Sequence, residues 1–420
     1  MHFPSIFNRL PDTRPRRSIA ITCMALLAVC LLTACPPKPV PPDQPLIPIA
    51  LTDYPYFEDT DGYAQLDQAI AGSLTYLRRL PASRSVAFGP DRYDVAHLID
   101  SLETLSDVVR DKPASAQLNR IIRERFAVYQ AAGRAGRRNV LFTGYYEPEL
   151  NGSRTPDSHF RVPIHTRPAD LLEIDLAPFG KDFKGRRIVA KQQGATLVPY
   201  PDRSGIRRIA GFDRMAPPIA WLVDEIDLFN LMIQGSGRVL VAGGEIIQVQ
   251  FDVSNGRPYR SIGRLLIDQG KISPEQMSMQ AIREYLSSHP GEMEAILDHN
   301  PRYIFFRQVD QGPQGALGVS LTPKRSVAVD RSLFPSAAPA FVQLSVPRLD
   351  GKGRIAGWRP HAALVLAQDA GSAIKGPGRV DLFWGHGAAA ETCAGRLKHP
   401  GSLYFLVLKS RRSVREHPDF

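Results

Sequence analysis

Short β-forming runs separated by turn signals recur along most of the chain and constrain its fold more than any other feature. The segment 140–147 is rich in aromatic and β-branched residues and stops at Pro148. Similar runs follow at 160–164, 188–189, 219–223, 239–241, 246–251, 303–306, 326–329, 340–346, 363–367, 380–384 and 403–408. Between residues 150 and 270 this composition is typical of a small barrel or sandwich. We therefore predict a mainly β chain with flanking helices.

Apolar residues at helical spacing predict four helices. Three precede the first strand, with apolar faces at 66–77, 95–105 and 118–129. Asp94 and Ser115 are expected to cap the second and third of these helices. The third should place Phe126 and Tyr129 on its inner face. A fourth helix is expected to open at 273–276, where Ser-Pro-Glu-Gln combines a capping box with proline in the first position.

Two aspartates stand at the ends of predicted strands, on either side of a loop of small residues. Asp369 follows the run at 363–367, and Asp381 belongs to the run at 380–384. The loop between them is rich in glycine, so a bulky ligand could approach its backbone. Asp381 is followed by Leu-Phe-Trp, and burial among such side chains favours the protonated carboxyl of a general acid. The alternative from spacing alone is that both aspartates cap turns.

The N-terminal segment indicates export to the bacterial envelope. Three arginines between residues 14 and 17 precede the uncharged run 19–34, which is too short to span a bilayer comfortably. The run ends in Leu-Thr-Ala-Cys, which looks like a bacterial lipobox with cleavage before Cys35. Residues 1–34 are therefore predicted to be a signal peptide, and Cys35 is predicted to carry a lipid anchor. The alternative is a plain secretory signal with a chance cysteine.

A proline-rich stretch follows the predicted lipidation site. Because seven prolines occur in residues 36–48, we predict that 35–52 is an extended spacer and that folded structure starts near Asp53. At the other end, residues 411–420 are predicted to form a basic, solvated tail. Pro36 stands where an aspartate is linked to inner-membrane retention in some bacteria. The predicted location is therefore the outer membrane, facing the periplasm.

Charge and cysteine content limit the classes of partner and cofactor. The formal net charge of +10 suits acidic glycans or lipid head groups, and no basic–aromatic stripe suggests nucleic acid. Three of the four cysteines lie in the signal peptide or at the lipidation site, so Cys393 has no partner for an intramolecular disulfide. No cysteine–histidine cluster has metal-ligand spacing. We predict neither a metal nor another cofactor.

Ordered motifs from about residue 53 to residue 409 resemble the membrane-bound lytic murein transglycosylase A family. The C-terminal 3D region of that family is named for three aspartates, and the matching positions here are Asp330, Asp369 and Asp381. Further matching segments lie at 142–148, 231–238, 255–263, 277–283 and 315–323. Motifs of this length and order are highly specific.

The resemblance implies an architecture of two domains. Members of the family have a double-psi β-barrel domain formed by the two ends of the chain, here 53–149 and 300–410. A second, smaller β-barrel domain is inserted between them, here 150–299, and the glycan groove lies in the cleft. A cleft between domains is a common place for an extended substrate to bind.

The resemblance also implies a reaction. The family cleaves the β-1,4 bond between N-acetylmuramic acid and N-acetylglucosamine without water, because the 6-hydroxyl of the muramic acid attacks C1 and leaves a 1,6-anhydro end. The sugar ring already holds this hydroxyl near its target, so one carboxyl group can suffice. Asp381 is expected to be the single acid and base. Asp369 is expected to orient the site or to stabilise positive charge at C1.

Polar and aromatic residues of the matching motifs are candidates for binding the glycan. They are Thr143, Tyr145, Tyr146, Gln234, Ser236, Tyr259 and Asp330. The tyrosines could stack on sugar faces, or they could be core aromatics with a hydroxyl partner. Asp330 precedes a turn at a strand end and could have a structural role instead.

Two further hypotheses stay open at this point. A muramidase-type hydrolase would use Asp369 and Asp381 as a pair, and the separation of their carboxyl groups would speak to this. A non-catalytic peptidoglycan-binding lipoprotein would hold glycan strands without cutting them. The expected partners are peptidoglycan glycan strands and the membrane, through Cys35. Cell-wall synthesis proteins are further candidates that no sequence feature identifies.

Overall fold

The computed structural model describes residues 44–410. The predicted signal peptide (1–34), the lipidation site Cys35, the first part of the proline-rich linker and the tail 411–420 lie outside the described residues. Within the described part of the chain, no helix has both the length and the apolar character needed to cross a membrane.

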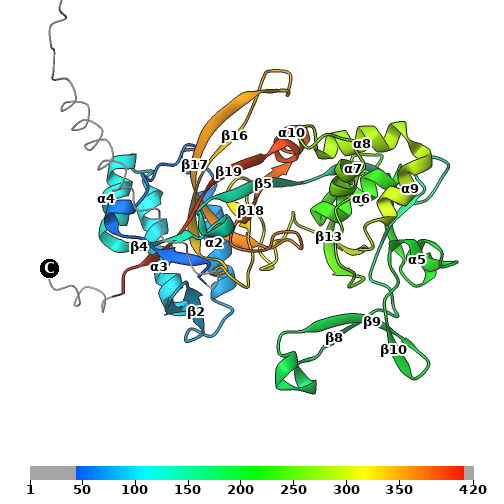
Figure 1. Cartoon of the computed structure of the whole chain (residues 1–420), viewed down its shortest axis with the longest axis horizontal. Coiled ribbons are helices and arrows are strands. Elements are labelled where there is room, and N and C mark those ends of the chain that lie inside the picture. The colour runs from blue at the N-terminus through cyan, green and yellow to red at the C-terminus, as the bar shows by residue number, and fades with distance from the viewer. Residues whose placement is uncertain (1–43, 411–420) are drawn as a thin grey trace, which may run out of the picture. The chain divides into compact units, whose positions relative to one another are not determined.

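An eight-stranded sheet combines the two ends of the chain (Figure 1). Its strands are β1 (Leu46–Pro48), β4 (Phe126–Ala131), β5 (Val140–Glu147), β15 (Ser326–Ala328), β16 (Pro339–Leu349), β17 (Ile355–Asp369), β18 (Arg379–His386) and β19 (Lys398–Leu408). Their order is β1-β4-β19-β16-β17-β15-β18-β5, and β5 also pairs with β19. This second pairing closes the strands from β19 to β5 into a barrel, which removes exposed strand edges.

Strand β1 lies within the segment that the sequence predicts to be a linker. Leu46–Pro48 pairs with β4, and Leu46 is fully buried. Folded structure therefore begins before Asp53. The proline content did not prevent pairing because β1 lies at the end of the sheet order, where proline is tolerated.

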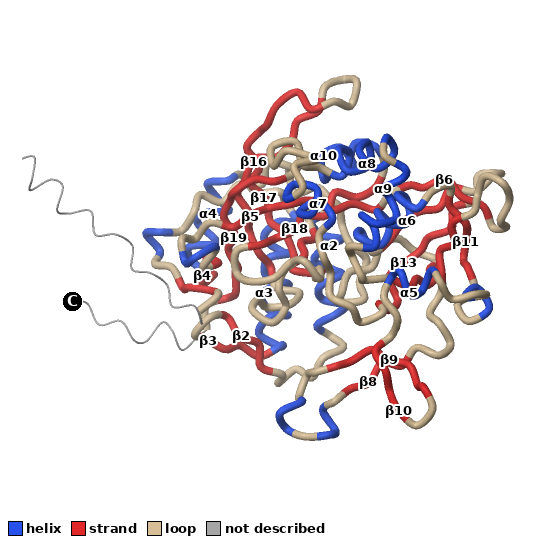
Figure 2. The backbone as a smooth tube through the Cα atoms, turned by 45° about the vertical axis from the view of Figure 1, so that its right-hand side comes forward, coloured by secondary structure: helices blue, strands red, loops and turns tan. Residues whose placement is uncertain are grey.

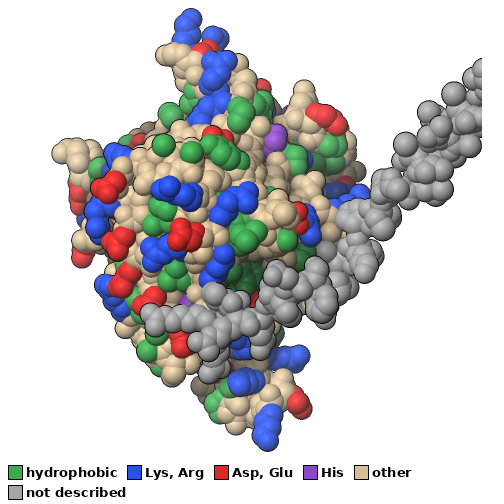
Figure 3. All heavy atoms as spheres, turned by 90° about the vertical axis from the view of Figure 1, so that its left-hand side faces the viewer, with side chains coloured by type: hydrophobic (Ala, Val, Ile, Leu, Met, Phe, Trp, Pro, Cys, Tyr) green, Lys and Arg blue, Asp and Glu red, His purple; other side chains and the backbone are tan. Residues whose placement is uncertain are grey.

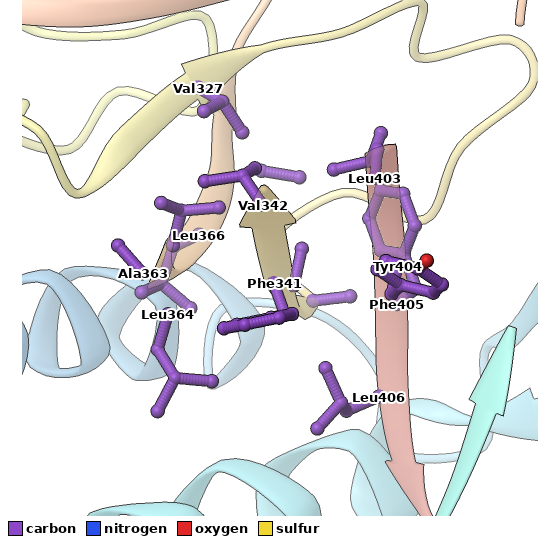
Figure 4. Close-up of a cluster of buried hydrophobic side chains, with 14 of the residues drawn as sticks. Val327, Phe341, Val342, Ala363, Leu364, Leu366, Leu403, Tyr404, Phe405 and Leu406 are labelled. Carbon is purple, nitrogen blue, oxygen red and sulfur yellow. The ribbon is translucent and has the colours of Figure 1, made fainter. Parts of the chain in front are cut away.

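Side chains of β16, β17 and β19 form the centre of the first core. Figure 4 shows Phe341 and Val342 of β16 between side chains from β17 on one side and from β19 on the other. Both residues are fully buried. Residues 361–368 of β17 are also all buried, because one face of the strand lies in the barrel and the other is covered by a helix.

Three helices near the N-terminus cover the first sheet. They are α2 (Leu66–Leu77), α3 (Val95–Arg110) and α4 (Ser115–Arg125), which contact β17, β19 and β4 respectively. Asp94 caps α3 as predicted, because its side chain accepts a hydrogen bond from the amide of His97. A hairpin of β2 (Ser85–Phe88) and β3 (Asp91–Asp94) leads into α3.

The third helix is shorter than the sequence predicts. α4 ends at Arg125, and the prediction that Phe126 and Tyr129 lie on its inner face is wrong because both belong to β4. β4 pairs with β1 and β19, so its aromatic and β-branched side chains serve a sheet although they recur at helical spacing. Ser115 does not cap the helix, since Ala114 occupies the N-cap position.

A six-stranded sheet lies in the segment inserted between the two ends. Its order is β14-β13-β12-β6-β11-β7, and its buried side chains form a second hydrophobic cluster. The bounds are β6 (Glu149–Ser153), β7 (Val162–His165), β11 (Pro218–Leu222), β12 (Ser236–Leu240), β13 (Ile246–Ser254) and β14 (Ile304–Val309). Because β14 pairs with β13, this sheet extends past the boundary that the sequence places at 299.

The inserted segment also carries a small sheet and several helices (Figure 2). The sheet contains β8 (Leu172–Asp175), β9 (Arg187–Gln193) and β10 (Thr196–Pro199). The helices are α5 (Arg203–Arg207), α6 (Glu225–Gln234), α7 (Ile262–Asp268), α8 (Met279–Ser288) and α9 (Pro290–Asp298). Single 3-10 turns occur at Leu51–Asp53, Arg134–Gly136, Ala177–Phe179, Lys181–Phe183 and Phe212–Arg214.

Helix α8 starts later than predicted. The Ser-Pro-Glu-Gln stretch at 273–276 forms a turn, and the N-cap residue of α8 is Ser278, which accepts a hydrogen bond from the amide of Ala281. A later serine thus provides the cap that the sequence predicts at Ser273. Helix α8 contacts α10 (Ala388–Arg396) of the C-terminal part of the chain. Gly395 of α10 lies so close to Gln280 of α8 that a Cβ at this position would come within 2.7 Å of the Gln280 side chain.

The hairpin of β16 and β17 carries exposed basic side chains at its tip. Figure 3 shows Lys and Arg gathered on the projection at the top of that view. Arg348, Lys352 and Arg354 are exposed there. Over the rest of this face, side chains of both charges are interspersed, which is typical of an ordinary solvated surface.

A buried ion pair connects the N-terminal segment to the barrel. Arg325 donates to both carboxyl oxygens of Asp59 at 2.6 and 2.9 Å, and the two side chains are 1% and 0% exposed. Arg325 also donates to the carbonyls of Ala64 and Leu364. The pair therefore holds the segment before α2 against β17, directly before β15 begins.

Replacing Asp59 by alanine should destabilise the protein strongly. The variant leaves the Arg325 guanidinium buried without its countercharge, a change that costs about 3–5 kcal/mol in comparable pairs. Urea unfolding of wild type and Asp59→Ala measures the difference. The matched control is Asp107→Ala, since Asp107 pairs with Arg110 on an exposed face of α3. That control should change the free energy of unfolding by about 1 kcal/mol or less; equal effects of the two variants would contradict the expectation.

Candidate active site

Strand β15 lies between the strands that carry the two aspartates. Its residue Ala328 is opposite Asp369 of β17 on one side and opposite Asp381 of β18 on the other. Cross-strand neighbours project from the same face of a sheet, so both carboxyl side chains leave the same side of the barrel wall. Their Cα atoms are two strand spacings apart, which is roughly 10 Å.

Both aspartates line a cavity of about 490 Å³. Its opposite wall comes from α6, β12, β13 and β14 of the inserted segment, through Met232, Ile233, Gln234, Ser236, Gln250, Phe251, Arg302, Ile304 and Arg307. A second cavity of about 230 Å³ shares Tyr145, Gln234, Arg302 and Asp381 with the first. The two cavities therefore form one continuous groove between the barrel and the inserted sheet.

Asp381 accepts a hydrogen bond from the neighbouring strand. β5 and β18 run parallel with Thr143 opposite Asp381, and Thr143 Oγ1 donates to Asp381 Oδ1. Among residues 44–410, no hydrogen bond reaches the second oxygen, Oδ2. Burial raises the pKa of the Asp381 carboxyl, against the Thr143 hydrogen bond and the charge of Arg379, while the charge of Asp369 adds to the rise. Asp381 is thus a carboxyl biased toward its protonated form with one oxygen unengaged.

Asp369 has both carboxyl oxygens engaged. Oδ2 accepts from the hydroxyl of Tyr145 at 2.7 Å, and Oδ1 accepts from the amides of Ala316 and Ala370, each at 2.8 Å. Burial raises the pKa of Asp369, against these three hydrogen bonds. Burial and the nearby carboxylates raise the pKa of Tyr145 well above its ordinary value, so its hydroxyl stays a donor. The carboxyl of Asp369 is therefore held in one orientation.

The residue before Asp369 fixes the backbone of β17 from the other side. Gln368 is fully buried; its Oε1 accepts from Ser326 at 2.6 Å, and its Nε2 donates to the carbonyl of Ala69 and to Ser73. The loop that carries the Ala316 amide passes close above it. A Cβ at Gly315 would come within 2.5 Å of the Gln368 carbonyl oxygen, so only glycine allows this approach.

Asp330 lies outside both cavities and organises a loop. Its Oδ1 accepts from the hydroxyl and the amide of Ser332, and its Oδ2 accepts from the amide of Gly376 at 2.9 Å. Burial alone would raise the pKa of Asp330, but these hydrogen bonds hold it below its ordinary value. Asp330 therefore fixes the loop between Asp369 and Asp381, and the structure does not bring its side chain to the groove.

Among the candidate tyrosines, Tyr145 and Tyr259 line the groove and Tyr146 does not. Tyr146 is 3% exposed, packs with Trp384, Ala390 and Ala394, and accepts a hydrogen bond from Asn230. Its ring is therefore closed to a sugar. The reason is alternation along β5, which points Tyr145 into the groove and its neighbour to the opposite face.

Gln234 and Ser236 both line the groove, from the end of α6 and the start of β12. Gln234 Oε1 accepts the amide of Tyr146 at 3.1 Å, so its side chain also ties α6 to β5. Ser236 is 7% exposed. Gly235 between them takes a positive φ of 82° as the helix C-cap, which is why a glycine separates the two polar residues.

Several residues that line the groove were not identified as candidates from the sequence. Phe251 of β13 is 38% exposed and offers an apolar face. The side chain of Gln250 donates to the carbonyl of Gln314 and accepts from its amide, which holds the segment around Gln314 at the groove. Arg302 and Arg307 line the same wall. Phe251 lies in a predicted strand, but only pairing in three dimensions shows which face of that strand meets the barrel.

Glu147 is a buried carboxyl at the crossing from the barrel to the inserted sheet. It is 1% exposed, and its Oε2 has no hydrogen-bond partner among the described residues. Burial raises its pKa to about 7, against the charge of Arg238 and together with that of Glu149. Glu147 ends β5 opposite His386, so it lies beside the groove rather than in it.

Two family models match the chain: "MltA specific insert domain" over residues 141–307 and "3D domain" over residues 325–407. Membrane-bound lytic murein transglycosylase A of Escherichia coli strain K12 is 32% identical over 281 residues, which cover 66% of this chain and 68% of the relative. A crystal structure of a membrane-bound lytic murein transglycosylase from Agrobacterium tumefaciens has 31% identity and a TM-score of 0.71, and the match covers 88% of this chain and 99% of that one.

The chain belongs to the membrane-bound lytic murein transglycosylase A family. The resemblance stated from its motifs is thereby confirmed, as is the predicted fold class: mainly β, with a closed barrel, an inserted second β domain and a groove between them. A crystal structure of the Escherichia coli relative MltA with bound chitohexaose has 26% identity and a TM-score of 0.63, covering 88% of this chain and 96% of that one. That relative thus binds chitohexaose.

Replacing Thr143 by valine should raise the pKa of the groove carboxyl further. The Thr143 hydroxyl favours the ionised form of Asp381, so its loss moves the pKa upward. If Asp381 must be protonated to act, the alkaline limb of kcat/KM against pH shifts to higher pH in Thr143→Val. The control is Thr196→Val on the exposed strand β10, which should leave the limb in place. A limb that stays in place or moves to lower pH in Thr143→Val would contradict this assignment.

Replacing Glu147 by glutamine should remove a pH dependence of stability. The pKa of Glu147 is about 7 in the folded protein and 4.5 ordinarily, so its carboxyl supports folding below pH 4.5 and loses that support as pH rises through 7. Wild type should lose about 3 kcal/mol relative to Glu147→Gln between pH 4 and pH 8. Urea unfolding at both pH values measures this. Glu284→Gln, on an exposed part of α8, should track wild type; a Glu147→Gln curve parallel to wild type would refute the effect.

Proposed function

We propose that this protein is a lipid-anchored lytic transglycosylase that cuts peptidoglycan strands in the bacterial envelope. It cleaves the β-1,4 bond between N-acetylmuramic acid and N-acetylglucosamine without water and releases 1,6-anhydromuramyl products. The observation that carries the proposal is the pair of unequal aspartates in a groove between the barrel and the inserted sheet. Membership of the lytic murein transglycosylase A family supports it, and chitohexaose bound to the Escherichia coli relative supports a glycan as the occupant.

Asp381 is the acid in this mechanism. Its pKa is raised by burial, and its Oδ1 is occupied by Thr143, so the unengaged Oδ2 presents the proton to the glycosidic oxygen. After the bond breaks, the same carboxylate accepts the proton of the attacking 6-hydroxyl. Because the nucleophile belongs to the substrate and is already close to C1, no second carboxylate is needed to supply it.

Asp369 has a supporting role. Its two oxygens accept three hydrogen bonds, so they are not free to attack C1 or to activate a water. A fixed negative charge near C1 would stabilise the positive charge that develops there. This arrangement favours a single-acid mechanism over the paired-carboxylate hydrolase, which needs its second carboxylate unengaged. Tyr145 and Thr143 position the two aspartates, while Gln234, Ser236 and Tyr259 line the groove for sugar contacts.

The protein acts from a membrane surface in this proposal. Relatives are named membrane-bound, which supports association with the envelope. Cleavage before Cys35 and lipidation of its thiol would tether the catalytic body through the proline-rich segment, in the outer membrane and facing the periplasm. Asp330 then acts as a structural residue of the 3D region, because its carboxyl fixes the loop between the other two aspartates.

Purified soluble protein should convert murein sacculi into anhydro-muropeptides, and Asp381→Asn should lose this activity. Loss of a general acid lowers rates on the order of 100- to 10,000-fold. Mass analysis of the soluble products measures both points. Asp350→Asn, in the turn of the β16–β17 hairpin, is the matched control and should retain the rate. Products one water heavier would indicate a hydrolase, and sacculus binding without soluble products would indicate a non-catalytic lipoprotein.

A further inference from the structure

Three arginines line the groove without a carboxylate partner. Arg302 and Arg307 line the larger cavity, and Arg302 and Arg379 line the smaller one. Their side-chain hydrogen bonds go to neutral atoms: the carbonyl of Arg257 at 3.3 Å for Arg302, Oε1 of Gln314 at 3.4 Å for Arg307 and Oγ1 of Thr143 at 3.4 Å for Arg379. Within residues 44–410, no carboxylate oxygen lies within 4.0 Å of these guanidinium groups.

Several arginines of the inserted segment, in contrast, form ion pairs with carboxylates. The pairs are Arg154 with Glu245, Arg167 with Asp252, Arg207 with Asp298 and Arg283 with Asp227. Arg302 and Arg379 are half-buried, and the buried Nε of Arg379 has no hydrogen-bond partner in the described part of the chain. A partly desolvated guanidinium that is not in contact with a carboxylate is suited to bind one from a ligand.

The charge that faces the ligand in the groove is positive. Its lining carboxyls are Asp369 and Asp381, and the proposed mechanism starts with Asp381 protonated. Asp369, whose oxygens accept hydrogen bonds from Tyr145, Ala316 and Ala370, contributes at most one negative charge. The three guanidinium groups therefore exceed the negative charge of the groove, and a neutral glycan would leave this excess positive charge uncompensated.

We infer that Arg302 and Arg307 bind carboxylate groups of the glycan and make the groove selective for acidic over neutral strands. The inference rests on the proposed function, because N-acetylmuramic acid carries a lactyl group that ends in a carboxylate when the stem peptide is absent. When the stem is present, its own carboxylates take this place. A planar guanidinium binds a carboxylate through two parallel hydrogen bonds, so two arginines on β14 and the segment before it provide two such contacts beside the acid.

The test compares an acidic and a neutral ligand on a protein that does not turn them over. In the full mature chain carrying Asp381→Asn, calorimetry measures the affinity for glycan strands stripped of stem peptides and for chitohexaose. The stripped strands should bind more tightly, and the difference should shrink as salt is raised because the contact is between charges. Equal affinities at low salt would overturn the inference.

Variants then locate the selectivity. Arg302→Gln and Arg307→Gln in the same background should each weaken binding of stripped strands by roughly three- to tenfold more than binding of chitohexaose. Arg302→Lys keeps the charge but not the two parallel hydrogen bonds, so it should retain part of the preference, which guards against a simple failure to fold. Arg161→Gln, an exposed arginine of the inserted segment outside both cavities, is the matched control and should leave both affinities unchanged. Equal losses for both ligands would overturn the inference.

A third ligand distinguishes the source of the carboxylate. Strands with intact stem peptides should lose affinity in Arg302→Gln and Arg307→Gln if stem carboxylates are bound, and loss on stripped strands alone assigns the lactyl carboxylate. Wild-type digestion of sacculi separates this inference from the proposed function. Anhydro products from wild type, together with unchanged selectivity in the variants, would refute the arginine assignment and leave the transglycosylase proposal standing.

Discussion

The position of β15 between β17 and β18 is the constraint on which the site depends. Ala328 is small and sits opposite both Asp369 and Asp381, so neither carboxyl is crowded by the strand that joins them. The register of a strand in a closed barrel cannot shift by one residue without turning its side chains to the other face of the sheet. The barrel therefore fixes which two carboxyls share the groove, although the residues come from strands separated by a loop.

Unequal hydrogen bonding gives two identical side chains different chemistry. Asp369 has three donors and no unengaged oxygen, whereas Asp381 has Thr143 alone and a raised pKa. Burial acts on both carboxyls in the same direction, so it is the donors that separate their roles. The opposite face of β5 is covered by α10, since a Cβ at Gly144 would come within 2.7 Å of the Ala394 backbone.

The sequence predicted much of the fold because its strands are strongly patterned. Val140–Glu147 has the predicted bounds, and Asp94 caps its helix. Predictions failed where pairing between distant segments determines the secondary structure. Phe126 and Tyr129 have helical spacing, but they lie in β4, which pairs with β19. The aspartates could be found from motif and surroundings. The contacts of Asp369 with Ala316 and the opposite wall formed by Phe251 could not, because they depend on how distant segments meet.

Gln368 connects the N-terminal helix α2 to the strand that carries Asp369. The two family models begin at residues 141 and 325, whereas Ala69 and Ser73 of α2, which accept the hydrogen bonds of the Gln368 amide, lie well before both. Arg325, too, depends on Asp59 from the same early segment. A fragment trimmed to the two matched regions would expose β17 and release the backbone that aims Asp369. The minimal catalytic unit of this enzyme is therefore larger than the two regions by which its family is recognised.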